Sequence, residues 1–315
     1  MKTYMNPATV ERFINRELAE WPLAATNYEA LKQVQTRFID VDGFQVKIQY
    51  NPARRVSTGA RIDRKSIEAR PCFLCRANRP PEQGALRWGP SYEFLVNPFP
   101  IFPRHLTIPE MTHTPQTSKG RGPHMMEMAR DLEGYAIFYN GPLCGASAPD
   151  HMHFQACPKA ELPLIEAVDR KMPPSTGNVE LQASLGFPFG FYIVDTHKRV
   201  EPKMATETVR TLYAVIDPSA DEDDYMTHEP MINIICYDTA DVTRFLIIPR
   251  KKHRPSNYGE GPGQILISPA SVDLGGVFIT PRKEDFDAVT ADDIRRIYRE
   301  CCYTESEIID VIDRI

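Results

Sequence analysis

Hydrophobic residues recur at helical spacing near the N-terminus and at alternate positions in several later segments. Five apolar residues predict a helix within residues 1–30: Val10, Phe13, Ile14, Leu18 and Trp21. Residues 38–50 alternate around an Asp42-Gly43 turn signal, which predicts a pair of strands. Further strands are predicted at 92–96, 106–108, 136–140, 151–156, 191–194, 231–237, 245–248 and 276–280. Helices are predicted at 125–132 and 292–301, the second with Thr290 as its N-cap.

This mixture of helices and strands predicts an α+β protein. A Pro- and Gly-containing stretch at 171–177 predicts a boundary between two halves, residues 1–170 and 171–315. The run 245–249 followed by His253 is similar to the run 105–109 followed by His113. That similarity favours a weak internal duplication.

Composition narrows the class of protein. The chain has 315 residues, of which 42% are hydrophobic and 25% charged, as in an ordinary globular protein. It contains no stretch of about 20 apolar residues, and residues 1–7 lack a secretory signal pattern. A net charge of −5 argues against binding to nucleic acid. We therefore expect a cytoplasmic protein without membrane or nucleic-acid partners, whose seven cysteines are reduced or bind metal.

The strongest chemical signal lies in residues 138–156, FYNGPLCGASAPDHMHFQA. Here a turn that contains Gly145, Ala146 and Ser147 leads into a His-x-His-x-Gln sequence. Backbone amides of such a turn can approach phosphate oxygens closely. On a strand His151, His153 and Gln155 would share one face. A neutral imidazole is a nucleophile near pH 7, and a glutamine can donate to a phosphoryl oxygen. The alternative is that the histidines merely decorate a sheet.

The Phe-Tyr-Asn, Gly-Ala-Ser and His-x-His-x-Gln elements resemble one branch of the histidine-triad superfamily. That branch contains dinucleoside tetraphosphate phosphorylases (ATP adenylyltransferases), GDP-hexose phosphorylases and galactose-1-phosphate uridylyltransferases. The resemblance implies antiparallel sheets with flanking helices, in two histidine-triad-like halves, the second of which completes the substrate pocket. It also implies that His153 forms a covalent nucleotidyl-histidine and that Gln155 binds the α-phosphate oxygens. Asn140 and Ser147 would line the phosphate and ribose, although His151 follows Ser147 by four positions, one more than in the family pattern.

The implied reaction is ping-pong transfer of a nucleoside monophosphate, with no organic cofactor. Its leading form is phosphorolysis of an NDP-hexose or a dinucleoside polyphosphate, with inorganic phosphate as acceptor. Transfer to a sugar 1-phosphate and hydrolysis are the enzymatic alternatives. A protein that binds nucleotide without turnover is the competing class.

A second constellation is the pair Cys72 and Cys75. Two thiolates at this spacing can hold one tetrahedral metal ion, and two further ligands are needed to complete the site. The Cys-Phe-Leu-Cys run is similar to the zinc motif of the uridylyltransferases, whose other ligands map onto His113 and His151. The alternative is a pair of reduced, partly buried thiols. With a structural zinc ion or without it, His151 is expected to orient the segment that carries His153.

Two basic segments can supply phosphate contacts. The first contains Arg54, Arg55, Arg61, Arg64 and Lys65, and the second is Arg250-Lys251-Lys252-His253-Arg254. We expect Arg54, Arg55 and Lys251 to bind substrate or acceptor phosphate, against the alternative of a solvated charged face. Four other histidines lack a supporting pattern and are expected to be structural or exposed: His105, His124, His197 and His228.

Overall fold

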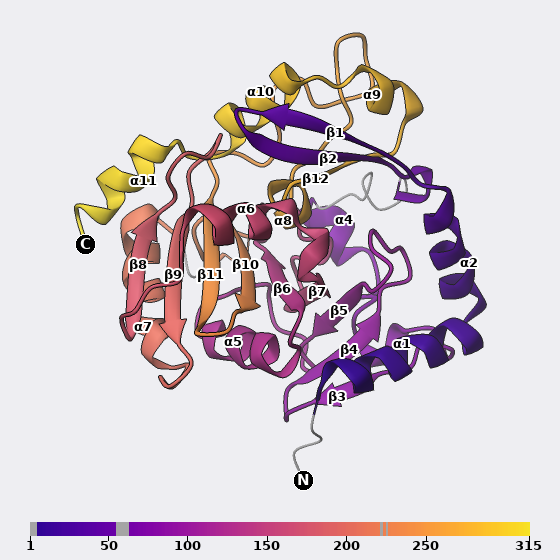
Figure 1. Cartoon of the computed structure of the whole chain (residues 1–315). Coiled ribbons are helices and arrows are strands. Elements are labelled where there is room, and N and C mark those ends of the chain that lie inside the picture. The colour runs from indigo at the N-terminus through magenta and orange to yellow at the C-terminus, as the bar shows by residue number, and fades with distance from the viewer. Residues whose placement is uncertain (1–4, 55–62, 221–222, 225) are drawn as a thin grey trace.

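A computed structural model describes residues 5–54, 63–220, 223–224 and 226–315. Its main feature is a nine-stranded, wholly antiparallel sheet in the order β3-β4-β5-β7-β6-β10-β11-β9-β8 (Figure 1). The strands are β3 (Leu86–Trp88), β4 (Tyr92–Val96), β5 (Leu106–Pro109), β6 (Tyr135–Asn140), β7 (His153–Pro158), β8 (Val179–Ala183), β9 (Tyr192–His197), β10 (Ile232–Asp238) and β11 (Val242–Pro249). The predicted α+β class is confirmed.

A smaller sheet joins the two ends of the chain. It consists of β1 (Gln35–Val41), β2 (Phe44–Tyr50) and β12 (Val277–Thr280). The predicted hairpin is confirmed, since β1 and β2 pair in antiparallel register up to Val41 and Phe44. Asp42 and Gly43 between them both have positive φ angles, 55° and 80°, as a tight turn between twisted strands requires. In contrast to the large sheet, β12 runs parallel to β2.

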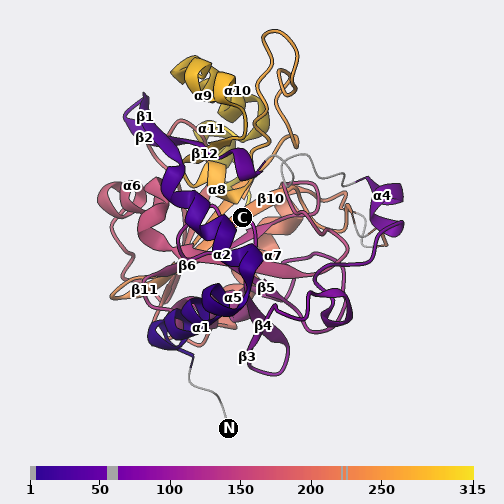
Figure 2. The same cartoon turned by 90° about the vertical axis from the view of Figure 1, so that its right-hand side faces the viewer.

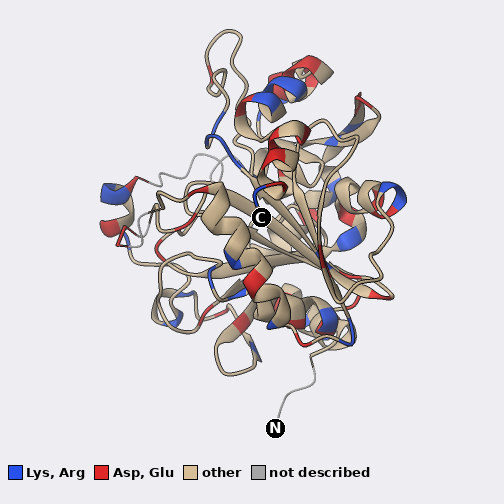
Figure 3. Cartoon of the chain, turned by 90° about the vertical axis from the view of Figure 1, so that its left-hand side faces the viewer, with Lys and Arg blue, Asp and Glu red and all other residues tan. Residues whose placement is uncertain are grey.

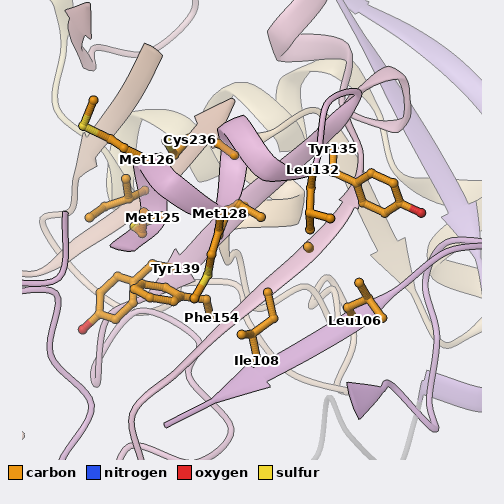
Figure 4. Close-up of a cluster of buried hydrophobic side chains, with 14 of the residues drawn as sticks. Leu106, Ile108, Met125, Met126, Met128, Leu132, Tyr135, Tyr139, Phe154 and Cys236 are labelled. Carbon is orange, nitrogen blue, oxygen red and sulfur yellow. The ribbon is translucent and has the colours of Figure 1, made fainter. Parts of the chain in front are cut away.

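Helices cover both faces of the large sheet. Alternate residues of its strands point to opposite faces, so Tyr139 and Phe138 enter different cores. The first core lies under α1 (Pro7–Glu20), α5 (Gly122–Asp131) and α7 (Met204–Ile216), and Figure 4 shows the side chains of α5 against Ile108 and Phe154. The second lies under the small sheet, α6 (Pro163–Lys171) and α10 (Ala291–Cys301). In Figure 2 the small sheet and α10 lie together at the top, with α1 and α5 at the bottom.

The remaining helices are short. They are α2 (Pro22–Ala30), α4 (Arg64–Glu68), α8 (Ser271–Leu274), α9 (Lys283–Ala288) and α11 (Glu305–Ile312), with 3-10 turns at Leu31–Gln33, Pro52–Arg54, Arg76–Asn78 and Lys159–Glu161. The first helix predicted within residues 1–30 is confirmed as α1, but it ends before Trp21, which is extended. Pro22, which lacks an N–H group, starts a second helix. The Thr290 cap is confirmed, since its side chain accepts a hydrogen bond from Asp293 N.

The strand order repeats within the large sheet. The order β4-β5-β7-β6 recurs as β8-β9-β11-β10, and the two sets meet where β6 pairs with β10. Asn140 lies directly opposite Asn233 at this junction. In this repeat β11 takes the place of β7, and not that of β5 as the sequence similarity between 245–249 and 105–109 indicates. Residues before and after 170 therefore share one continuous sheet.

The surface carries charge of both signs. Figure 3 marks basic and acidic residues close together along the helices of this side of the molecule, without a face of one sign. None of the described helices is long and apolar enough to cross a membrane.

Candidate active site and metal centre

His153 begins β7 at the point where β7 separates from β6. The two strands pair from Tyr135 and Pro158 as far as Phe138 and Gln155. Beyond that pair, the side-chain amide of Gln116 lies between them: Nε2 donates to Asn140 O (2.9 Å) and His153 O (3.1 Å), and Oε1 accepts from His153 N (2.8 Å). Because Gln116 is completely buried, these bonds fix the backbone of His153.

The predicted row of His151, His153 and Gln155 on one strand is wrong for His151. His151 precedes β7, in a turn where its N–H donates to Ala148 O (3.1 Å). His153 and Gln155 share a face of β7, whereas Phe154 enters the first core. The physical reason is that the Gln116 amide takes the place of β6, so the ladder between β6 and β7 ends before His151.

The hydrogen bonds of His153 define its tautomer. Nδ1 lies 2.9 Å from His151 O, which can only accept, so the proton is on Nδ1 and the lone pair is on Nε2. Nε2 has no hydrogen-bond partner among the described residues. Burial lowers the pKa of His153 to about 4. The imidazole is therefore neutral near pH 7 and presents an unprotonated nitrogen.

Gln155 is oriented by His105. Ile101 N donates to His105 Nδ1 (3.1 Å), so Nε2 carries the proton of the neutral ring and donates to Gln155 Oε1 (2.9 Å). Burial, helped by the positive charge of Arg54, lowers the pKa of His105 to about 3, which keeps the ring neutral. With its oxygen engaged, Gln155 presents its NH₂ group on the face of β7 that carries His153.

The side-chain amide of Asn140, like that of Gln155, is held through its oxygen. Its Oδ1 accepts from Ser271 N (2.9 Å) and from Asn233 Nδ2 (2.9 Å), so that the side-chain NH₂ group has no partner among the described residues. Two neutral amides thus offer donors on the face of the sheet that carries the unprotonated imidazole nitrogen. Such an arrangement can hold an anion without protonating the nucleophile.

The predicted metal ligands Cys72, Cys75, His113 and His151 converge. Their ligand atoms all lie within 4.8 Å of one another. Cys72 Sγ is 3.2 Å from His151 Nδ1, and Cys75 Sγ is 3.2 Å from His113 Nδ1 and 3.5 Å from His151 Nδ1. Sulfur and nitrogen ligands of a tetrahedral zinc ion lie roughly 3.5 Å apart, given their bond lengths to the metal. The four residues therefore fit a metal ion.

His151 connects this metal cluster to the nucleophile. Its Nε2 lies 2.9 Å from Glu110 O, which can only accept, so the Nδ1 that faces the thiols is free of its proton. Its carbonyl oxygen holds Nδ1–H of His153. The ring of His151 thus faces the two thiols while its backbone carbonyl accepts from the ring of His153.

The other predicted substrate residues lie in varied surroundings. Arg54 Nη1 donates to Phe99 O (2.6 Å), and its charge acts on His105. Gly145 has a φ angle of 96° and approaches Ala270 so closely that a Cβ atom would lie 2.5 Å from the Ala270 Cβ. Ala146 is buried beside it, and Ser147 is exposed. Lys251 forms an ion pair with Glu307 of α11 (2.7 Å). Arg55 and Arg61 lie outside the described residues.

Sequence reasoning missed four residues of this site: Gln116, His105, Asn233 and Arg250, whose guanidinium donates to Asn233 Oδ1 (2.7 Å). None stands in a motif with the His-x-His-x-Gln sequence. Each reaches the site from a different segment of the chain, so only the fold brings them together. No sequence pattern singled out Gln116 or Asn233, while His105 and Arg250 were assigned other roles.

Comparison with known proteins identifies the fold. Residues 13–158 match a family described as a domain of unknown function (DUF4922), and no curated protein matches the sequence. Yeast Ap4A phosphorylase Apa2 in complex with AMP aligns with a TM-score of 0.58 over 90% of this chain and 96% of that chain, at 16% identity. The same enzyme in complex with Ap4A gives 0.59, over 90% and 97%, at 15% identity. This chain has the fold of an Ap4A phosphorylase.

The expected histidine-triad-like fold is thereby confirmed. An ADP-glucose phosphorylase from Arabidopsis thaliana with bound ADP-glucose aligns over 84% of this chain and 99% of that chain at 15% identity, with a TM-score of 0.33. The Ap4A phosphorylase fold spans both sets of strands in the large sheet.

Proposed function

We propose that the protein is a nucleotidyltransferase that cleaves a dinucleoside polyphosphate or an NDP-hexose by phosphorolysis through a nucleotidyl-histidine. The observation that carries the proposal is the 2.9 Å hydrogen bond from His153 Nδ1 to His151 O. It leaves Nε2 as a nucleophile on the face of the sheet that carries two amides, whose NH₂ groups have no partner among the described residues. The likeness to an Ap4A phosphorylase seen with AMP and with Ap4A supports a nucleotide as the substrate.

In the first step, His153 Nε2 attacks the α-phosphorus. The N–P bond forms as the P–O bond to the leaving group breaks, and that oxygen takes the electron pair. The ring becomes cationic and keeps its Nδ1 proton, which the carbonyl of His151 continues to accept. The Gln155 and Asn140 amides donate to the non-bridging oxygens, whose charge increases in the transition state.

In the second step, an oxygen of inorganic phosphate attacks the same phosphorus. The new P–O bond forms as the N–P bond breaks, which returns His153 to its neutral state and releases a nucleoside diphosphate. Splitting one displacement into two replaces a difficult reaction by two easier ones. A sugar phosphate would be the acceptor in the transferase alternative, and water in the hydrolytic one.

The remaining phosphate contacts belong to the same proposal. We assign Gly145, Ala146 and Ser147 to the phosphate-binding turn and Arg54, Arg55 and Lys251 to phosphate binding. Of these, Arg54 has the strongest support, because its charge already acts within the site. The segments 1–170 and 171–315 are proposed as two histidine-triad-like halves, and the repeated strand order supports that division.

We further propose that the metal cluster holds one zinc ion. Two thiolates and two imidazoles are a preferred donor set for a closed structural zinc site. Bound there, zinc would cross-link the Cys72–Cys75 turn to His151 and supply no group to the transfer itself. Burial raises the pKa of the Cys72 thiol to about 11, because the thiolate is poorly solvated there. A bound dication would offset this by stabilising the thiolate.

The test is to mix the protein with Ap4A in the absence of phosphate and measure the intact mass after quenching. A nucleoside monophosphate should accumulate on His153, and added phosphate should release it as a nucleoside diphosphate. His153→Ala should abolish the adduct and slow turnover by several orders of magnitude. His197→Ala, a histidine of β9, is the matched control and should be fully active.

Two outcomes would change the assignment. An adduct on another residue, or wild-type turnover in His153→Ala, would overturn the mechanism. Release of nucleoside monophosphate at an equal rate without phosphate would identify a hydrolase.

A further inference from the structure

We infer that Asn233 and Arg250 are positioning residues that hold the Asn140 amide with its NH₂ group toward the substrate phosphate. The inference rests on the proposed function, since it assigns a task to the anion-binding role of Asn140. Both residues come from the segment after residue 170. The second set of strands would thus act on the nucleophile's site directly, through β10 and the end of β11.

The contacts form one chain of buried hydrogen bonds. Arg250 Nη1 donates to Asn233 Oδ1 (2.7 Å), and Asn233 Nδ2 donates to Asn140 Oδ1 (2.9 Å). Asn233 Nδ2 also lies 2.8 Å from Cys144 O. Asn233 is 0% and Arg250 4% exposed, so water does not compete for these groups.

The direction of each bond in this chain is fixed. A guanidinium can only donate, which identifies the Asn233 atom beside Arg250 as oxygen and its other atom as nitrogen. The carbonyl of Cys144 can only accept, which gives the same result independently. On Asn140, Ser271 N can only donate, so Oδ1 faces Ser271 and Asn233 while Nδ2 faces away. A flipped Asn140 would place its NH₂ group against two donors.

Arg250 is held as firmly as the amides that it orients. Its remaining N–H groups donate to the carbonyls of Cys301 (3.0 Å), Pro269 (3.0 Å), Lys252 (3.2 Å) and His253 (3.0 Å). No carboxylate among the described residues forms a salt bridge with it. Burial of a cation without a carboxylate partner is costly. A role in orienting Asn233 gives a reason for keeping it.

The position in the sheet explains why these residues can act together. Asn140 and Asn233 are directly opposite on β6 and β10, the two strands through which the repeated strand sets meet. Their side chains therefore lie on one face at the spacing of a cross-strand pair. Arg250 follows β11, whose last residue Pro249 pairs with Ile232, the residue before Asn233.

Asn233→Asp tests the inference with little change of shape. The carboxylate still accepts from Arg250 but cannot donate to Asn140 Oδ1, and it repels that oxygen. We expect adduct formation from Ap4A to slow roughly a hundredfold, the usual effect of losing one donor to a developing oxyanion. Because the buried carboxylate also faces Cys144 O, the variant should lose some stability, so its rate is measured well below its unfolding temperature. Asn233→Ser removes the same donor without adding charge and should also slow the reaction.

A double-mutant cycle separates positioning from a purely structural role. Asn140→Ala should slow adduct formation about as much as Asn233→Asp, and the double variant should be no slower than either, because both remove one interaction. Thr243→Val is the matched control: Thr243 is also buried in the large sheet, with hydrogen bonds to Arg130 and Asp238. It should lose stability but keep the wild-type rate.

The outcomes distinguish this inference from the proposed function. Effects of Asn140→Ala and Asn233→Asp that multiply, or a wild-type rate in Asn233→Asp, would overturn the inference alone. If the wild type forms no adduct, the same cycle is measured on AMP affinity, where each variant should weaken binding at least about tenfold and the pair no further. Failure of the wild type to bind AMP would overturn both.

Discussion

Replacing Gln116 by alanine should destabilise the protein and slow the proposed reaction together. The side chain makes three buried hydrogen bonds, to Asn140 O, His153 O and His153 N, and its exposure is 0%. Each such bond contributes about 1 kcal/mol net, and a buried group left unpaired costs about 1–3 kcal/mol. Allowing for partial relaxation, we expect a loss of about 3–5 kcal/mol in the free energy of unfolding. That is a large part of the stability of an ordinary domain.

Denaturant unfolding of wild type and Gln116→Ala measures this loss, with the single-turnover rate of adduct formation as the second readout. Gln182→Ala is the control, because within the described part of the chain the Gln182 side-chain amide bonds only to exposed Glu180, so its loss should change stability by less than about 0.5 kcal/mol. Gln116→Glu should lose more stability than its nearly unchanged size indicates, since its carboxylate would face two backbone carbonyls. A Gln116→Ala protein as stable and as fast as Gln182→Ala would refute the view that this amide positions His153.

Two further predictions concern the metal cluster and the histidine behind Gln155. Protein purified without chelator should contain about one zinc ion per chain, and Cys75→Ser should reduce this to less than roughly a tenth, while Cys157→Ala, a buried thiol outside the cluster, keeps the metal. Wild-type protein that stays below a tenth after zinc is added would contradict the assignment. The pKa of His105 falls from its ordinary value near 6.5 to about 3, so the unfolded chain binds a proton that the folded protein does not. Stability should therefore fall from pH 6.5 toward pH 3, with His105 contributing up to about 1.4 kcal/mol per pH unit, and His105→Gln should flatten the curve; parallel curves would contradict this.

Local pattern accounts for much of what could be predicted. The turn at Asp42 and Gly43, the Thr290 cap and most strands of the large sheet follow from spacing within a few residues. The Cys72–Cys75 pair followed from its spacing and the two distant histidines from a family resemblance, and the fold brings all four residues together. These features depend on short-range geometry or on a motif that keeps its spacing.

The errors have long-range causes. His151 looked like the first residue of a strand because it alternates with His153 and Gln155. Whether a strand continues depends on its neighbour, however, and here the Gln116 side chain, from a segment 37 residues away, occupies the neighbour's place. Alternation along one segment carries no information about the neighbouring strand.

The electrostatic design of the site follows from how its donors are fixed. The groups that orient Gln155 or Asn140 are backbone N–H groups, a guanidinium, an amide, and a histidine whose pKa is about 3. None of them gains or loses a proton near neutral pH. The two NH₂ groups therefore keep their direction through the physiological range. In the proposed reaction such neutral donors would stabilise a phosphoryl oxygen without lowering the basicity of the imidazole, as a lysine or arginine at the same place would. We therefore expect oriented amides, and not cations, next to the imidazole nitrogen, and the buried charge of Arg250 lies two hydrogen bonds behind the Asn140 amide.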